Sequence, residues 1–186
     1  TYTAEGLKQT TDGGFIYSAQ KKVSQSGNTI SSVASIVRMD TGFNKVWIYN
    51  SVYPSIYTGL FDLEILGDGS IVACGQRLYY DTDSTTILSG WLIKLDTSGH
   101  VIWDRVYTGI NATSIKNFLT DIDVLPDGGL IAVGQCQRPG HTPPQVGWFL
   151  KLDSNGCEIE NCLVGIDEQV SPTSNLQLNI YPNPFT

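Results

Sequence analysis

Large apolar residues recur at every second position in the clearest run of the chain. From Trp91 to Leu95, the side chains of positions 91, 93 and 95 fall on one face, and Leu92 and Lys94 fall on the other. A period of two is typical of a β-strand, whose successive side chains point to opposite faces. No stretch shows convincing helical periodicity, so the pattern predicts an all-β fold.

The segment around this strand occurs three times. Each copy is an apolar strand ending in a cation, an apolar residue and Asp, followed by a Gly-containing turn and a second strand. The copies read IVRMDTGFNKVW from Ile36, LIKLDTSGHVIW from Leu92 and FLKLDSNGCEIE from Phe149. A second landmark, an Asp-Gly pair at positions 12, 68 and 127, keeps a similar spacing of 56 and then 59 residues. Two landmarks that share one period identify an internal repeat.

Each repeat is predicted to contain four short strands. An Asp-Gly pair between apolar runs favours a tight hairpin, because Gly supplies the positive φ that the turn requires. In the second repeat we expect strands at about 57–66, 70–76, 90–95 and 101–107. Polar, variable loops are expected at 21–32, 78–89 and 137–146. Four antiparallel strands in a repeat of roughly 40 to 60 residues are typical of a β-propeller blade.

The predicted fold class is therefore an all-β propeller built of four-stranded antiparallel blades. The blades are expected to span about 1–56, 57–115 and 116–164. Three blades do not close a ring, since propellers contain about four or more. The chain is expected to be either the end of a larger propeller or an arc capped by a partner. A repeat already under way by Leu7, with no initiator Met or leader before it, indicates that the N-terminus has been cut away or left out.

The residues that recur in the repeats have mechanical roles in this interpretation. The carboxylates of Asp40, Asp96 and Asp153 are expected to accept backbone N–H groups inside their turns, while a nearby Gly takes the left-handed conformation. Trp47 and Trp103 are expected to pack between neighbouring blades. Residues that recur in successive repeats are more readily explained by structure than by a single ligand site.

Composition excludes two classes of partner. The chain has 186 residues and a net charge of −7, and its 11 basic residues are scattered, so nucleic acid is not an expected partner. No apolar run approaches the roughly 20 residues that span a bilayer, so no transmembrane segment is expected.

The four cysteines divide into two pairs. In the third repeat CEIENC replaces the Trp-bearing strand, and Glu160 stands at the Trp position. Along one extended strand, Cys157 and Cys162 would lie about 16 Å apart, too far for a disulfide. A loop closed by a Cys157–Cys162 bridge explains the altered strand, and it would imply an oxidising location. Cys74 and Cys136 are either buried free thiols or an inter-blade bridge.

The chain ends in a different pattern. A polar linker at 165–175 is followed by LQLNIYPNPFT at 176–186. This segment resembles the opening of the type A C-terminal sorting domain of the type IX secretion system of Bacteroidota, an alternating strand followed by Tyr-Pro-Asn-Pro. The matching residues are Leu178, Ile180, Tyr181, Pro182, Asn183 and Pro184. The match covers only these last eleven residues.

The resemblance implies export across the outer membrane and a secreted or cell-surface location. It also implies two partners, the type IX secretion translocon and its outer-membrane shuttle, which would bind the C-terminal signal. The repeats resemble the DGG-containing propeller repeats of such cargo, and more loosely the Trp-bearing repeats of quinoprotein dehydrogenases.

Sequence motifs give no catalytic, cofactor-binding or metal-binding residue. No nucleophile elbow, phosphate-binding glycine loop or His-Glu metal motif is present. Asp81 and Asp83 could recruit calcium, but a solvated turn explains them without the further ligands of a calcium loop. Asp83-Ser84-Thr85 resembles the pattern of Bacteroidota protein O-glycosylation, which makes Ser84 a candidate site.

These observations favour a non-catalytic secreted or cell-surface propeller that binds a protein or glycan through its blade loops. The alternative is the C-terminal part of a secreted enzyme whose catalytic residues lie upstream. Such an enzyme would be a polysaccharide-active hydrolase or a quinoprotein-like dehydrogenase.

Overall fold

The structure is a computed structural model in which every regular element is a β-strand. It describes residues 2–26, 29–52, 57–80, 86–109, 116–137 and 145–158. Within these ranges there is no helix that is long and apolar enough to cross a bilayer.

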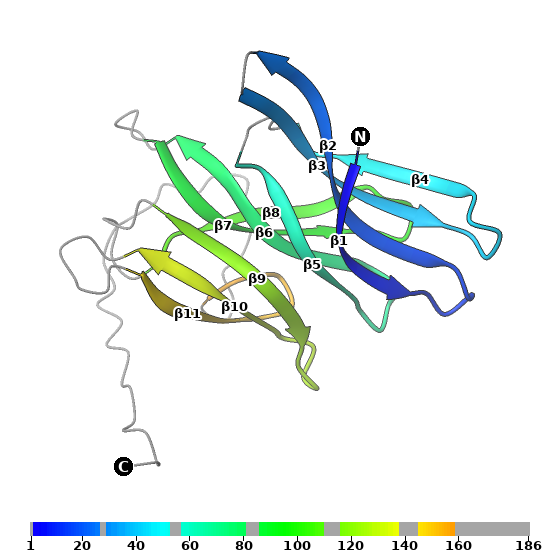
Figure 1. Cartoon of the computed structure of the whole chain (residues 1–186). Coiled ribbons are helices and arrows are strands. Elements are labelled where there is room, and N and C mark those ends of the chain that lie inside the picture. Colours follow the sequence, from blue (N-terminus) through cyan, green and yellow to red (C-terminus); the bar gives the residue numbers. More distant parts are fainter. Residues whose placement is uncertain are drawn as a thin grey trace, which may run out of the picture.

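The strands form three antiparallel sheets, each built in chain order (Figure 1). The first sheet contains β1 (Tyr2–Gln9), β2 (Phe15–Ser26), β3 (Thr29–Met39) and β4 (Lys45–Asn50). The second contains β5 (Gly59–Ile65), β6 (Ile71–Tyr80), β7 (Thr86–Leu95) and β8 (Val101–Tyr107). The third contains β9 (Asn117–Val124), β10 (Leu130–Gln137) and β11 (Gln145–Leu152). In the third repeat the segment at 157–162 was expected to replace the fourth strand, and its residues 159–162 lie outside the described residues.

The described residues of two of the three predicted loops form strands instead. The β2–β3 pairing continues to Ser26 opposite Thr29, and the β6–β7 pairing continues to Tyr80 opposite Thr86. The expected loops at 21–32 and 78–89 are therefore mostly the ends of long hairpins. The polar side chains of these segments made them look like loops in the sequence. The backbone hydrogen bonds of a ladder, however, form whatever the side chains are. The expected loop at 137–146 agrees better, since β10 ends at Gln137 and β11 begins at Gln145.

The core lies in two layers, one on each side of the second sheet. Trp91, Ile93 and Leu95 pack toward the first sheet, with Ile16 and Ile36. The opposite face of the second sheet, including Leu92, packs against the third sheet. These two faces of β7 are the ones that the alternation predicts.

The three sheets converge along their first strands. β5 lies against both β1 and β9, and Figure 1 shows the second sheet between the other two. Each of β5 and β9 carries an irregularity in its pairing with the next strand. Glycine is required there, because a Cβ on Gly75 would lie 2.0 Å from the carbonyl oxygen of Gly59, and one on Gly134 would lie 1.9 Å from that of Phe118.

Candidate functional site

A groove opens between the first and second sheets, at the end where the β1–β2 and β5–β6 turns lie. Its volume is about 890 Å³. Ile16, Ile65 and Ile71 supply apolar parts of its lining. Most of the other lining side chains are polar: Lys8, Gln9, Thr10, Thr11, Asp12, Arg38, Glu64, Asp68 and Thr97.

The two turns that border the groove have the same construction. In the first, the N–H of Gly13 donates to the carbonyl of Thr10 at 2.9 Å, and Gly13 has a φ of +84°. In the second, the N–H of Gly69 donates to the carbonyl of Leu66 at 2.9 Å, and Gly69 has a φ of +80°. Glycine adopts this left-handed conformation without a Cβ clash, so the Asp-Gly sequences fix the shape of both borders.

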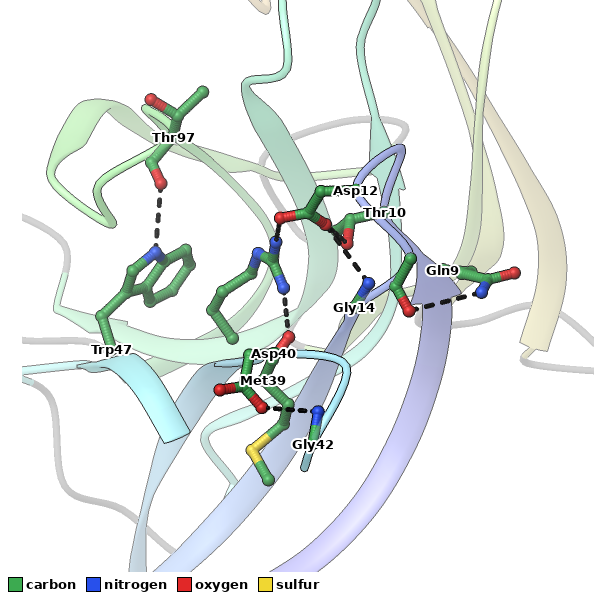
Figure 2. Close-up of polar contacts among 11 residues, drawn as sticks. Gln9, Thr10, Asp12, Gly14, Met39, Asp40, Gly42, Trp47 and Thr97 are labelled. Carbon is green, nitrogen blue, oxygen red and sulfur yellow. Dashed lines mark hydrogen bonds and ion pairs between the residues drawn. The ribbon is translucent and has the colours of Figure 1, made fainter. Parts of the chain in front are cut away.

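Asp12 is held by its own turn and by Arg38. Its Oδ1 accepts hydrogen bonds from the Thr10 hydroxyl at 2.6 Å and from the N–H of Gly14 at 3.2 Å (Figure 2). Its Oδ2 accepts a 2.5 Å hydrogen bond from Nη2 of Arg38. The Thr10 hydrogen bond, followed by that from Gly14, lowers the pKa of Asp12 below its usual value. The rim of the groove therefore carries an ionised carboxylate at neutral pH.

A second ion pair joins the first sheet to the second across the groove wall. Lys8 on β1 bonds Glu64 on β5. The hydrogen bond to Glu64 raises the pKa of Lys8 and outweighs burial, which acts in the opposite direction. Both side chains are partly exposed, so we expect the pair to contribute about 0–1 kcal/mol to stability. Its charges remain partly accessible to a ligand.

Trp47 crosses from the first sheet to the β7–β8 turn of the second. Its indole N–H donates to the carbonyl of Thr97 at 3.1 Å, as Figure 2 shows. Its ring lies against Gly99, where an added Cβ would be 2.8 Å from Cε3 of the indole. The contact between an indole ring and a turn glycine recurs in the next pair of sheets, where a Cβ on Gly156 would be 3.0 Å from Cη2 of Trp103. The buried Nε1 of Trp103 has no hydrogen-bond partner among the described residues, unlike that of Trp47. Both Trp rings therefore lie between neighbouring sheets.

The Asp residues of the repeated turns each accept two backbone N–H groups through Oδ1. The donors are Gly42 and Asn44 for Asp40, Ser98 and His100 for Asp96, and Asn155 and Cys157 for Asp153, all at 2.8 to 2.9 Å. The bond from the backbone of Asn44 is the largest cause lowering the pKa of Asp40, and that from the backbone of His100 has the same effect on Asp96. These carboxylates are thus occupied by their own turns.

The prediction that a Gly takes the left-handed conformation is wrong in the first of these turns. Gly99 and Gly156 have φ values of +85° and +75°, but in the first turn Phe43 has the positive φ, +61°. The Gly of that turn is Gly42, one residue before the position that Gly99 and Gly156 occupy in their own turns. The Phe43 ring stacks on Phe15 with centroids 5.5 Å apart, which offsets part of the backbone strain.

The free cysteines of the described part of the chain are Cys74 and Cys136, and both are buried. Of the two alternatives for this pair, the structure therefore has free thiols. Cys157 is buried and is not among the free cysteines. Its predicted partner, Cys162, lies outside the described residues, so the bridge stays a prediction.

Several other predicted residues also lie outside the described residues. They are Ser84, the linker at 165–175 and the sorting-signal residues Leu178, Ile180, Tyr181, Pro182, Asn183 and Pro184. The groove itself was not predicted from the sequence, because its Asp-Gly turns were interpreted only as hairpins. Opposite charges at equivalent positions, Lys8 in the first repeat and Glu64 in the second, are a signal that could have pointed to it.

The groove offers hydroxyl, amide and charged groups over a few apolar side chains. Among the described residues, no three His, Cys, Asp or Glu side chains gather as a metal site would require. Comparison of the sequence with models of known protein families found no match. Comparison with curated proteins found no match either.

Proposed function

We propose that this chain is a non-catalytic binding module that takes a glycan in the groove between its first two sheets. The supporting observation is the lining, in which Gln9, Thr10, Thr11 and Thr97 accompany the ionised Asp12 along the groove. A glycan presents many hydroxyl groups that both donate and accept hydrogen bonds. Such a ligand suits a groove rich in hydroxyl, amide and carboxylate groups better than an apolar ligand does.

The sequence favoured a protein or glycan partner bound through the blade loops. The groove instead places the proposed site at the β1–β2 and β5–β6 turns, at the opposite ends of the strands from the variable segments at 21–32 and 78–89. Arg38 already bonds Asp12 and the carbonyl of Met39, so it stiffens the rim before any ligand arrives. A rim fixed in this way loses less conformational freedom on binding.

A glycan array followed by calorimetric titration of the bound glycans tests this proposal. Thr11 is exposed on the rim, and Thr11→Tyr should block the groove and abolish binding. Pro126 is exposed at the equivalent position of the β9–β10 turn, outside the groove, so Pro126→Tyr is the matched control and should bind normally. The proposal fails if no glycan binds, if both variants bind alike, or if the bound glycan is hydrolysed or oxidised.

We also propose that the three sheets are consecutive blades of a β-propeller. Each sheet is built in chain order, and the first strands β1, β5 and β9 lie in sequence beside one another, as inner strands around an axis would. An experimental structure in which further repeats do not continue this arrangement around a common axis would overturn the assignment.

Export by the type IX secretion system is the third part of the proposal, and the C-terminal motif at 176–186 supports it. The protein should reach the cell surface in a bacterium with this translocon and remain inside a translocon-deficient strain. Surface display in both strains would contradict it. The predicted Cys157–Cys162 bridge belongs with this location, and peptide mass mapping without reductant should recover the two cysteines linked.

A further inference from the structure

The charged side chains of the groove form two ion pairs and leave one carboxylate over. The charged residues that line it are Lys8, Asp12, Arg38, Glu64 and Asp68. Arg38 bonds Asp12, and Lys8 bonds Glu64, so each cation of the lining is already neutralised by a carboxylate. Asp68 therefore gives the groove a surplus of one negative charge.

Asp68 occupies in the β5–β6 turn the position that Asp12 occupies in the β1–β2 turn. Its Oδ1 accepts a hydrogen bond from the N–H of Ser70 at 2.9 Å and another from the Ser70 hydroxyl. The turn thus uses only one oxygen of each Asp, and the difference lies at Oδ2. Oδ2 of Asp12 bonds Arg38, whereas Oδ2 of Asp68 has no hydrogen-bond or ion-pair partner among the residues that the structure describes.

The repeat shows why Asp68 has no partner of this kind. Lys94 stands in the second repeat where Arg38 stands in the first, but the ion pair of Arg38 has no counterpart between Lys94 and Asp68 within the described residues. Hydrogen bonds from Ser70 are the largest cause lowering the pKa of Asp68, and attraction by Lys94 contributes less. The side chain is exposed, so an ionised carboxylate is accessible on the rim of the groove.

A hydroxyl-bearing side chain borders the turn that holds this carboxylate. A Cβ on Gly69 would lie 3.1 Å from Cγ2 of Thr97, so the β7–β8 turn reaches the β5–β6 turn here, and Thr97 lines the same groove. A sugar ring bound beside Thr97 would present one of its substituents to Asp68. The substituent that suits an unpaired carboxylate best is a cation that also donates hydrogen bonds, as an ammonium group does.

We propose that the glycan taken by this groove carries free primary amino groups, and that Oδ2 of Asp68 binds one of them in its protonated form. The inference rests on the glycan-binding function proposed above and names the class of glycan, a 2-amino-2-deoxy sugar that is not acetylated. Acetylation would remove the positive charge of the amine. Anionic sugars are disfavoured, because they add negative charge to a groove that already has a surplus of it.

Calorimetric titration with three oligosaccharides of equal length tests this inference. Their units are glucosamine, glucose and glucuronic acid, and the first two differ only by an ammonium group in place of one hydroxyl. A titration at about pH 6 keeps the amine protonated, since an α-amino group loses its proton at about pH 7.7–8.0. We expect the glucosamine oligosaccharide to bind about 3- to 10-fold more tightly than the glucose oligosaccharide, and the uronate to bind most weakly. Added salt should reduce this preference, because it screens an exposed charge pair.

A pair of matched variants locates the charge. Asp68→Asn removes the charge and keeps the Oδ1 acceptor that holds Ser70, so the turn is retained. The glucosamine oligosaccharide should then bind no more than about 2-fold more tightly than the glucose oligosaccharide. Asp127 accepts the N–H of Gly129 at 2.9 Å in the equivalent turn of the third repeat, outside the groove. Asp127→Asn makes the same change in net charge and should keep the full preference.

Equal binding of the glucosamine and glucose oligosaccharides to the wild-type chain would overturn the inference and leave the glycan-binding function standing. So would tighter binding of the uronate, or a glycan array on which only glycans without a free amine bind. A preference that Asp68→Asn retains, or that Asp127→Asn also loses, would overturn the role of Asp68. If no glycan binds at all, both the inference and the proposed function fail.

Discussion

Adding one methyl group at Gly90 tests how the second and third sheets interlock. In the structure the new Cβ would lie 2.6 Å from Cζ3 and 2.8 Å from Cη2 of Trp148, and 3.2 Å from Cγ of Leu119. Trp148 is 7% exposed and Leu119 is 0% exposed, so neither side chain has free space to move into. Gly90→Ala therefore overpacks a buried contact.

The magnitude follows from two opposing effects. Replacing Gly by Ala inside a strand stabilises by roughly 0.5–1 kcal/mol, because the unfolded chain loses freedom. Overpacking a well-packed core costs about 1–3 kcal/mol. The net expectation for Gly90→Ala is a loss of about 0.5–2 kcal/mol in the free energy of unfolding.

Gly147 is the matched position in the third sheet. Nothing lies within 4 Å of its added Cβ, so Gly147→Ala should be neutral or stabilising by up to about 1 kcal/mol. Equilibrium urea unfolding at low protein concentration measures both variants against the wild type. If Gly90→Ala is as stable as Gly147→Ala, the ring of Trp148 does not occupy the space above Gly90 and the described packing is wrong.

Three further predictions concern a turn, a carboxyl pair and a thiol. Gly99→Ala should lower the free energy of unfolding in urea more than Gly128→Ala does. Both glycines have positive φ, but of the two only Gly99 lies against a Trp ring. A difference of less than about 0.5 kcal/mol between the two variants would contradict that contact. Burial, together with a hydrogen bond to Asp121, raises the pKa of Asp62. The contribution of Asp62 to stability is therefore greatest at acid pH, where its carboxyl is protonated, and is lost as the pH rises through the raised pKa. Asp62→Asn should therefore stabilise at pH 7 by under about 1 kcal/mol, with a gain that vanishes toward about pH 3, and a pH-independent effect would refute this cause. Burial raises the pKa of the Cys74 thiol, so mass spectrometry should find it unalkylated in native protein at pH 8 and alkylated in urea; rapid native labelling would contradict its position.

Alternation and turn chemistry are the parts of the fold that the sequence predicts well. The two faces of β7 follow from the period of two, and the hairpins at the Asp-Gly pairs follow from the need for positive φ. Both are local properties, decided by a few consecutive residues. Both features are therefore found in the structure as predicted, because they depend little on the rest of the chain.

Properties that depend on distant residues were harder to predict. Phe43 occupies the left-handed position of its turn, and the stacking of its ring on Phe15, which is far away in the sequence, offsets part of the strain. The groove depends on two turns and on a Lys8–Glu64 pair that joins two sheets. Hairpin length was underestimated, since backbone pairing extends past the last apolar residue. Predicting each of these features requires knowing how strands and sheets that are distant in the sequence are placed relative to one another.

The groove is the central claim about function, and mapping by ¹H–¹⁵N NMR tests it most directly. A glycan found on the array would be titrated into labelled protein, and the backbone amides that shift would be assigned. We predict shifts at Gln9 to Asp12 and at Leu66 to Gly69, on the two turns that border the groove. Shifts confined to the ends of the β2–β3 and β6–β7 hairpins, or no shifts at either turn, would contradict the proposed binding site.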